Sequence, residues 1–250
     1  MISKRIIPCL DIAHGKVVKG IRFEGVKEVD DPITLAKRYC EEGADELVFY
    51  DIMASYEERA LFLDVVSSVA AQINIPFMVG GGIRTLDDMH ACLKAGADKI
   101  SLNSAAIDNP NLIQAGAQRF GSQCMVLSMD VLVENDGFVR VMKKGGREAT
   151  SLEAFTWAQQ GIELGAGEIV LNVINQDGTK EGFDVNLTQA FASRFSVPII
   201  ASGGAGHAKH MADVLVAGAD AALAASIFHF KEVSIQEVKE AVRKAGCIVR

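Results

Sequence analysis

The feature that most limits how this chain can fold is a phrase that it contains twice. "GADKISLNSAA" begins at Gly96 and "GADAALAASIF" begins at Gly218, so the copies lie 122 residues apart (218 − 96). The match extends upstream at the same spacing, where "IPFMVGGGIR" from Ile75 lies over "VPIIASGGAG" from Val197. The chain therefore reads as two copies of one half-domain, over approximately residues 1–122 and 123–250.

Short apolar runs alternate with helix-period stretches along the whole chain. The runs are "RIIPCLDI", "ELVFYDI", "PFMVGGG", "KISLNS", "CMVLSMDV", "EIVLNVI", "PIIASGG" and "AALAAS", each ending near an Asp, Gly, Asn or Ser. A helical stretch follows each run, often with Gly after its last turn. Eight strand–helix units in two sets of four predict an α/β fold, one (β/α)8 TIM barrel domain over residues 1–250. An open doubly wound sheet is less favoured, since no GxGxxG follows the first strand.

Composition excludes several classes of protein. A net charge of −7 argues against a chain that mainly grips nucleic acid, which requires clustered Lys and Arg. Five cysteines without a CxxC pair indicate neither a disulfide framework nor a zinc knuckle, and fit a reducing cytoplasm. No stretch of about 18 apolar residues predicts a membrane span.

Two aspartates are the candidate catalytic residues. Asp11 ends the first strand and Asp130 ends the fifth, which are opposed positions in an eight-stranded ring. Side-chain alternation places Arg5 and Asp11 on one face of their strand, so both carboxylates are expected to converge at the mouth. Two facing carboxylates in a partly dry mouth can serve as one proton donor and one acceptor. The alternative is that each Asp only caps the helix that follows.

The duplicated glycine turns predict two phosphate sites. Glycines let backbone N–H groups approach a phosphate, and Ser104 or Ser226 adds a hydroxyl at the next strand end. Sites on opposite sides of the ring imply an elongated substrate with a phosphate at each end. Lys19 is a candidate to meet an anionic substrate or to pair with Asp11. The alternative reading is that the glycines only permit tight turns.

Charged residues also mark the opposite end of the barrel. They fall at the starts of strands 1, 2, 4 and 6, and they are Arg5, Glu46, Lys99 and Glu168. A ring of ion pairs there would be either a plain plug or a gate that admits a small molecule. Residues 133–151 form the longest polar insertion, a candidate flap or a plain surface hairpin. The histidines suggest no metal site, because His207 and His210 lack an evident third ligand.

Seven motifs in order resemble one family. They are "KRIIPCLD", "DELVFYDI", "VGGGIR", "GADKIS", "NQDGT", "IASGGAG" and "GADAALAAS", and they span nearly the whole chain. They resemble the cyclase subunits of imidazole glycerol phosphate synthases. The resemblance implies a cytoplasmic enzyme of histidine biosynthesis that needs no cofactor. It implies that ammonia from a separate glutaminase subunit, its partner in a heterodimer, converts the bisphosphate PRFAR into imidazole glycerol phosphate and AICAR.

The resemblance also implies roles for individual residues. Asp11 and Asp130 would be the acid–base pair, and Lys19 would bind substrate. One phosphate would be held by Gly82, Asn103 and Ser104, and the other by Asp177, Gly178, Gly204, Ala225 and Ser226. Arg5, Glu46, Lys99 and Glu168 would form the ammonia gate, and Asp98 and Gln123 would face the glutaminase. Met53, where a Thr is common, and the apolar Leu132 and Val133 depart from the family pattern.

Two other functions stay open at this point. The sister isomerase that prepares PRFAR shares the half-barrel repeat, two strand-end Asp and two phosphate sites, but it has no use for an ammonia gate. A barrel that only conducts ammonia to another synthase tends to lack the carboxylate at the position of Asp11. "PCLD" and the four charges at the other end favour the cyclase.

Overall fold

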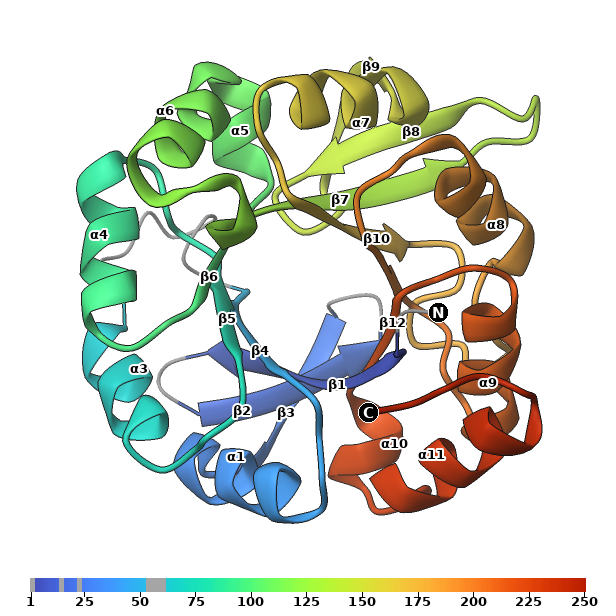
Figure 1. Ribbon diagram of the computed structural model, residues 1–250. Coiled ribbons are helices and arrows are strands. Elements are labelled where there is room, and N and C mark those ends of the chain that lie inside the picture. Colours follow the sequence, from blue (N-terminus) through green and yellow to red (C-terminus); the bar gives the residue numbers. More distant parts are fainter. Residues whose placement is uncertain (1–2, 14–15, 22–23, 53–61) are drawn as a thin grey trace.

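The fold is a closed barrel of parallel strands surrounded by helices (Figure 1). The computed structural model describes residues 3–13, 16–21, 24–52 and 62–250, without the side chains of 19–21 and 24–29. Within these residues eight parallel strands pair around the ring in the order β10, β11, β12, β1, β4, β5, β6 and β7, and β10 closes it on β7. The strands are β1 (Arg5–Ala13), β4 (Leu47–Asp51), β5 (Phe77–Gly80), β6 (Lys99–Leu102), β7 (Met125–Val133), β10 (Glu168–Val173), β11 (Ile199–Ser202) and β12 (Ala221–Ala224). The predicted (β/α)8 TIM barrel is confirmed.

Helices follow the strands and form the outer layer. The longer ones are α1 (Pro32–Glu41), α3 (Leu63–Ala70), α4 (Leu86–Lys94), α6 (Asn111–Phe120), α7 (Ala154–Glu163), α8 (Val185–Arg194), α9 (Ala208–Val216) and α11 (Ile235–Lys244). Thr85 and Ser234 begin α4 and α11 with capping boxes, which satisfy backbone donors at these helix starts. Among the described residues the layer also contains two short helices after β6 and β12, α5 (Ser104–Asp108) and α10 (Ser226–His229), and a 3₁₀ turn over Ser122–Cys124. None of the described helices is long and apolar enough to span a bilayer.

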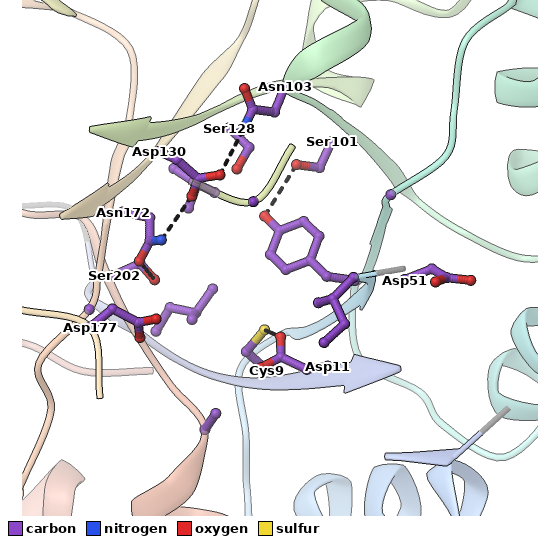
Figure 2. A pocket seen from close by; sticks show the side chains of 18 of the residues that line it. Cys9, Asp11, Asp51, Ser101, Asn103, Ser128, Asp130, Asn172, Asp177 and Ser202 are labelled. Atoms are coloured by element: carbon purple, nitrogen blue, oxygen red, sulfur yellow. Dashed lines mark hydrogen bonds between the residues drawn. The ribbon is translucent and has the colours of Figure 1, made fainter. Parts of the chain in front are cut away.

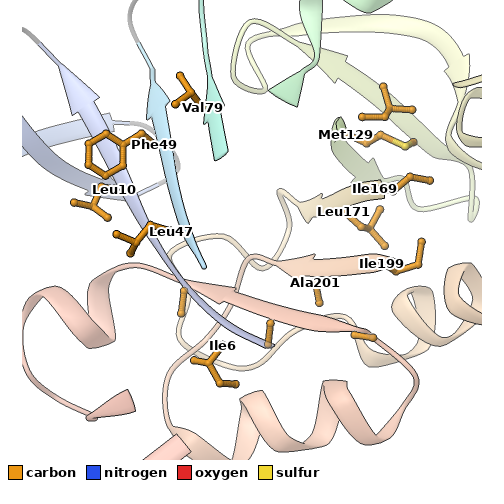
Figure 3. Close-up of a cluster of buried hydrophobic side chains, with 14 of the residues drawn as sticks. Ile6, Leu10, Leu47, Phe49, Val79, Met129, Ile169, Leu171, Ile199 and Ala201 are labelled. Carbon is orange, nitrogen blue, oxygen red and sulfur yellow. The ribbon is translucent and has the colours of Figure 1, made fainter. Parts of the chain in front are cut away.

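Strand residues alternate between two cores. Outward-facing side chains such as Ile6 and Leu10 pack between strands and helices, where Figure 3 shows them with residues from the other strands. Inward-facing Ile7 and Cys9 pack with residues of the other strands inside the barrel. Because both faces are covered, β1 is buried from Ile6 to Ala13 and reads as an almost continuous apolar run.

Two antiparallel hairpins extend opposed barrel strands. β8 (Val139–Lys143) and β9 (Glu148–Glu153) extend β7, so the polar insertion after the fifth strand forms a hairpin. β2 (Lys16–Ile21) and β3 (Glu24–Asp30) extend β1 in the same way. No strand is predicted over residues 16–30, because charged residues interrupt the apolar alternation there. Pairing with β1 nevertheless makes this segment a hairpin.

The aspartate of the repeated "GAD" phrase has a structural role. Asp98 accepts a hydrogen bond from the Phe77 N–H at 2.9 Å, and Asp220 accepts one from the Ile199 N–H at 3.0 Å. The related "GAG" phrase has Gly167 in place of the aspartate. A Cβ at this position would lie 2.3 Å from the Ser122 carbonyl oxygen, so there is no room for a side chain. The repeated phrase therefore fixes where neighbouring strands begin.

Candidate active site

A cavity opens at the carboxyl ends of the barrel strands, and both candidate aspartates line it. Asp11 lies in β1 and Asp130 lies in β7, and three strands separate these two in either direction around the ring. Their side chains come from opposite sides of the cavity (Figure 2). Only 7% of Asp11 and 8% of Asp130 is exposed. The two predicted carboxylates therefore share one cavity.

Neither aspartate caps a helix. The N-cap of α1 is Asp31, whose side chain accepts from the Thr34 N–H. The N-cap of α7 is Glu153, whose carboxylate accepts from the Phe155 and Thr156 N–H groups. The capping alternative for Asp11 and Asp130 is therefore wrong, because each lies within a strand that continues into a hairpin.

Two side-chain amides hold Asp130 (Figure 2). Asn103 Nδ2 donates to Oδ2 and Asn172 Nδ2 donates to Oδ1, both at 2.8 Å. Ser202 Oγ donates in turn to Asn172 Oδ1 at 3.0 Å, which keeps the amide group of Asn172 turned toward Asp130. Because both carboxylate oxygens accept a hydrogen bond, the side chain of Asp130 has one well-defined orientation.

Burial raises the pKa of Asp130 to about 6. The hydrogen bonds from Asn172 and Asn103 favour the ionised form and oppose this rise, whereas the negative charges of Asp177 and Asp11 add to it. A carboxyl group with a pKa near neutrality can both give and take a proton under ordinary conditions. This property suits Asp130 for acid–base work.

Asp11 has different neighbours. Cys9 Sγ donates to Asp11 Oδ1 at 3.7 Å, and Tyr50 lies beside Asp11 on the adjacent strand. Tyr50 lines the cavity, and its hydroxyl is 3.2 Å from Ser101 Oγ. Burial raises the pKa of the Tyr50 phenol above its ordinary value, so the hydroxyl stays protonated. The two catalytic candidates thus sit among different groups, as is required if they take different roles.

Glycine corners flank the cavity on opposite sides of the ring. Gly81 and Gly82 follow β5, and Gly203 and Gly204 follow β11, all with φ between +73° and +102°. A Cβ on Gly81 would lie 2.2 Å from the Asp51 carbonyl oxygen, and one on Gly204 would lie 2.0 Å from the Gly182 carbonyl oxygen. The backbone geometry alone therefore requires glycine at both corners.

The serines at these corners line the same cavity. Ser104 Oγ accepts a hydrogen bond of 2.8 Å from the Lys144 N–H, which comes from the turn between β8 and β9. Asn103 has its amide donors turned to Asp130, and its Oδ1 has no hydrogen-bond partner among the described residues. A carbonyl oxygen repels a phosphate, so in this arrangement the side chain of Asn103 supports the Asp130 carboxylate instead.

Four charged side chains form a closed ring at the other end of the barrel. Arg5 bridges Glu46, at 2.6 Å, and Glu168. Lys99 bridges the same two carboxylates, with Nζ–Oε distances of 2.9 Å to Glu46 and 2.7 Å to Glu168. Burial disfavours the charge on Arg5, but the two carboxylates outweigh it and raise its pKa. Asp98 and Gln123 are exposed near the starts of β6 and β7, at this same end.

Comparison with known proteins agrees with this geometry. Residues 5–234 match the sequence model of the family described as "Histidine biosynthesis protein". The chain is 54% identical over 253 residues to the "Imidazole glycerol phosphate synthase subunit HisF" of Lysinibacillus sphaericus, and 55% identical over 252 residues to that of Geobacillus thermodenitrificans. Both alignments cover 100% of each chain. The chain belongs to the HisF family. The family predicted from the motifs is confirmed.

Most of the site residues that the resemblance to HisF predicts lie together around the cavity. The cavity is lined by Asp11, Gly82, Asn103, Ser104, Asp130, Asp177, Gly178, Gly204, Ala225 and Ser226. Lys19 lies in β2, but its side chain is outside the described part of the structure, as is Met53. Within the described residues no group of three His, Cys, Asp or Glu is placed to hold a metal. The roles of the cavity residues stay predictions.

Sequence reasoning missed Asn172 and Ser202. Asn172 lies four residues after Glu168, so strand alternation already indicates that it faces inward. It also pairs in register with Asp130 on β7. The signal for Asn172 is its inward-facing parity, which strand alternation indicates for every residue at a strand end and not only for the acidic ones.

Proposed function

We propose that this chain is the cyclase subunit of imidazole glycerol phosphate synthase and that Asp11 and Asp130 are its acid–base pair. The observation that carries the proposal is the buried Asp130, with a pKa of about 6, facing Asp11 across the cavity. Membership of the HisF family supports the same reaction. PRFAR and ammonia are the proposed substrates, and imidazole glycerol phosphate, AICAR and water are the products.

The proposed chemistry needs protons to move at two stages. Ammonia attacks the ketose carbonyl carbon of PRFAR, and loss of water leaves an imine. The imine nitrogen then attacks the formamidine carbon, cleavage of the C–N bond releases AICAR, and a proton shift from the ring CH2 carbon to the neighbouring nitrogen gives the aromatic imidazole. At each stage a leaving group takes up a proton and a nitrogen loses one. Two carboxyl groups on opposite sides of the substrate are placed to donate and to accept these protons.

The two glycine corners are the proposed phosphate sites. Gly82, Asn103 and Ser104 would hold one end of PRFAR, with Asn103 contributing through its backbone. Asp177, Gly178, Gly204, Ala225 and Ser226 would hold the other. Both corners line the one cavity from opposite sides of the ring, which supports a substrate that spans the mouth between the aspartates. Lys19 is proposed to join them.

We expect Ser104→Ala and Ser226→Ala to weaken binding at opposite ends of the substrate. Each change removes one hydroxyl donor, which should raise the dissociation constant of a singly phosphorylated fragment for that corner about ten-fold. Calorimetric titration of each variant with imidazole glycerol phosphate and with AICAR tests this. Equal weakening of both compounds by one variant would contradict two independent sites.

We expect Asn172→Leu to raise the pKa of Asp130 further. The Asn172 hydrogen bond favours the ionised carboxylate, so its loss leaves burial less opposed. The limb of the pH profile of kcat/KM that belongs to Asp130 should therefore move to higher pH, whether Asp130 acts as acid or as base. Ser202→Ala, which only frees the orientation of Asn172, should move it less. A limb that stays in place, or moves to lower pH, argues against this role.

Ammonia is proposed to enter through the charged ring. Arg5, Glu46, Lys99 and Glu168 would be the gate, and a glutaminase subunit would dock over this end of the barrel in a heterodimer. The exposed Asp98 and Gln123 would face it. The related chains are named as subunits, which supports a complex. Free cysteines in the structure fit the proposed cytoplasmic setting.

The experiment that tests the proposed function is turnover of PRFAR by the purified chain with ammonium chloride at alkaline pH. Free ammonia then replaces the glutaminase. Imidazole glycerol phosphate and AICAR should form in equal amounts. Absence of both products, or conversion of the substrate of the sister isomerase instead, would refute the proposal.

A further inference from the structure

The cavity has an uneven charge balance. Among the described residues that line it, Asp11, Asp51, Asp130 and Asp177 are acidic, and Lys144 is the one basic residue. A bisphosphate that enters such a cavity meets four carboxylates. Any cation already at its wall therefore has a large influence on how the substrate binds.

Lys144 lies at the corner of the cavity that Ser104 occupies. It follows β8 at the turn of the hairpin, with φ +56°, and its neighbour Gly145 also lines the cavity. Its backbone N–H donates to Ser104 Oγ at 2.8 Å. Since the hydroxyl oxygen accepts this bond, its own proton can point to a ligand. The hairpin thus places an ammonium group and a hydroxyl donor at one corner.

The ion pairs of the hairpin leave Lys144 able to change partners. Its Nζ lies 2.8 Å from Glu148 Oε2, and 44% of the Lys144 side chain is exposed. Glu148 has a second partner, because Lys143 Nζ lies 2.9 Å from its other oxygen, Oε1. Lys143 also bridges Asp108 at 2.8 Å, and its side chain is only 18% exposed. If Lys144 turns to a ligand, Glu148 therefore keeps a cation, and the exposed pair that breaks is a weak one.

We propose that Lys144 is a phosphate-binding residue, which on substrate binding exchanges Glu148 for the phosphate group held by Ser104. This deepens the proposed function and rests on it. The opposite corner, around Ser226, has no lysine or arginine among its described lining residues. A lysine thus helps to bind the phosphate at the Ser104 corner, whereas the described residues of the Ser226 corner bind the other phosphate without one.

The test compares Lys144→Met with Lys143→Met. The second variant loses more ion pairs but removes no residue that lines the cavity, so it controls for hairpin stability. Loss of one charge-assisted contact should raise KM for PRFAR about ten-fold in Lys144→Met, with kcat within roughly two-fold of wild type. Lys143→Met should change KM by less than about two-fold, and Lys144→Arg should restore most of the affinity.

A second measurement uses inorganic phosphate, so that the outcome does not depend on turnover. Calorimetry of the full chain should show that Lys144→Met loses affinity at one of two phosphate sites while Lys143→Met keeps both. Unchanged phosphate binding and unchanged KM in Lys144→Met would overturn the proposal, as would an equal loss in both variants. Wild-type chain that binds phosphate but does not turn over PRFAR would instead refute the proposed function.

Discussion

Replacing Asp130 by Asn is expected to lower the turnover of PRFAR with ammonium salts by about 100- to 10,000-fold, the usual contribution of a general acid or base. An amide cannot exchange a proton near neutral pH, whereas Asp130 has a pKa of about 6. Asp11→Asn should have an effect of similar size, because it removes the opposite carboxylate. PRFAR binding should stay within a few-fold, since neither residue belongs to the glycine corners. The measurement is single-turnover kinetics beside a calorimetric binding curve.

The pH dependence of the free energy of unfolding shows whether Asp130→Asn stays folded, and so serves as the control for its loss of turnover. The folded-state pKa of Asp130 lies above its ordinary value of 3.8, so its contribution to folding is fully present below about pH 4 and is lost as pH rises through 6. The rise in the pKa of Asp130 corresponds to a loss of ~3 kcal/mol in the free energy of unfolding at neutral pH. Asp130→Asn should not show this loss and should remain folded. A variant that keeps more than roughly a tenth of wild-type turnover would refute the catalytic role.

Strand alternation and the internal repeat predict much of this molecule. Arg5 and Asp11 have the same parity on β1, and the structure puts one in the charged ring and the other in the cavity. Opposed positions in an eight-stranded ring follow from strand number alone, so the facing of Asp11 and Asp130 needs no knowledge of side-chain contacts. The division into half-barrels near residue 122 stays a prediction.

Hydrogen-bond partners were beyond the reach of the sequence. Asn103 and Asn172 meet Asp130 because the stagger between β6, β7 and β10 brings three strand ends to one level. That stagger is a property of the closed ring and not of any one segment. The same holds for the contact of Lys144 with Ser104, which depends on how far the hairpin leans over the cavity. The parity of a residue on its strand indicates whether its side chain faces inward, whereas the stagger of strands in the closed barrel determines which inward-facing side chains touch.

Replacing Lys99 by Met is expected to lower the free energy of unfolding by about 3–5 kcal/mol. Lys99 bridges Glu46 and Glu168, whose side chains are only 1% and 7% exposed. Its removal leaves two buried carboxylates that share the single charge of Arg5. Chemical denaturation at neutral pH measures the loss. A loss below about 1 kcal/mol would show that water reaches the ring and screens it.

The second variant separates a gate from a plug. Lys99→Met combined with Glu46→Gln removes one charge of each sign and leaves Arg5 paired with Glu168, so most of the lost stability should return. Arg5 and Asp11 are six residues apart on β1, roughly 20 Å by strand rise, so turnover with added ammonium salt should stay near wild type. If the ring is only a plug, glutamine-driven turnover with the partner should recover with stability. If the ring is the ammonia gate, as proposed, the double variant should be stable yet still release more glutamate than imidazole glycerol phosphate. One glutamate per cyclised product in this variant would leave the ring a structural role alone.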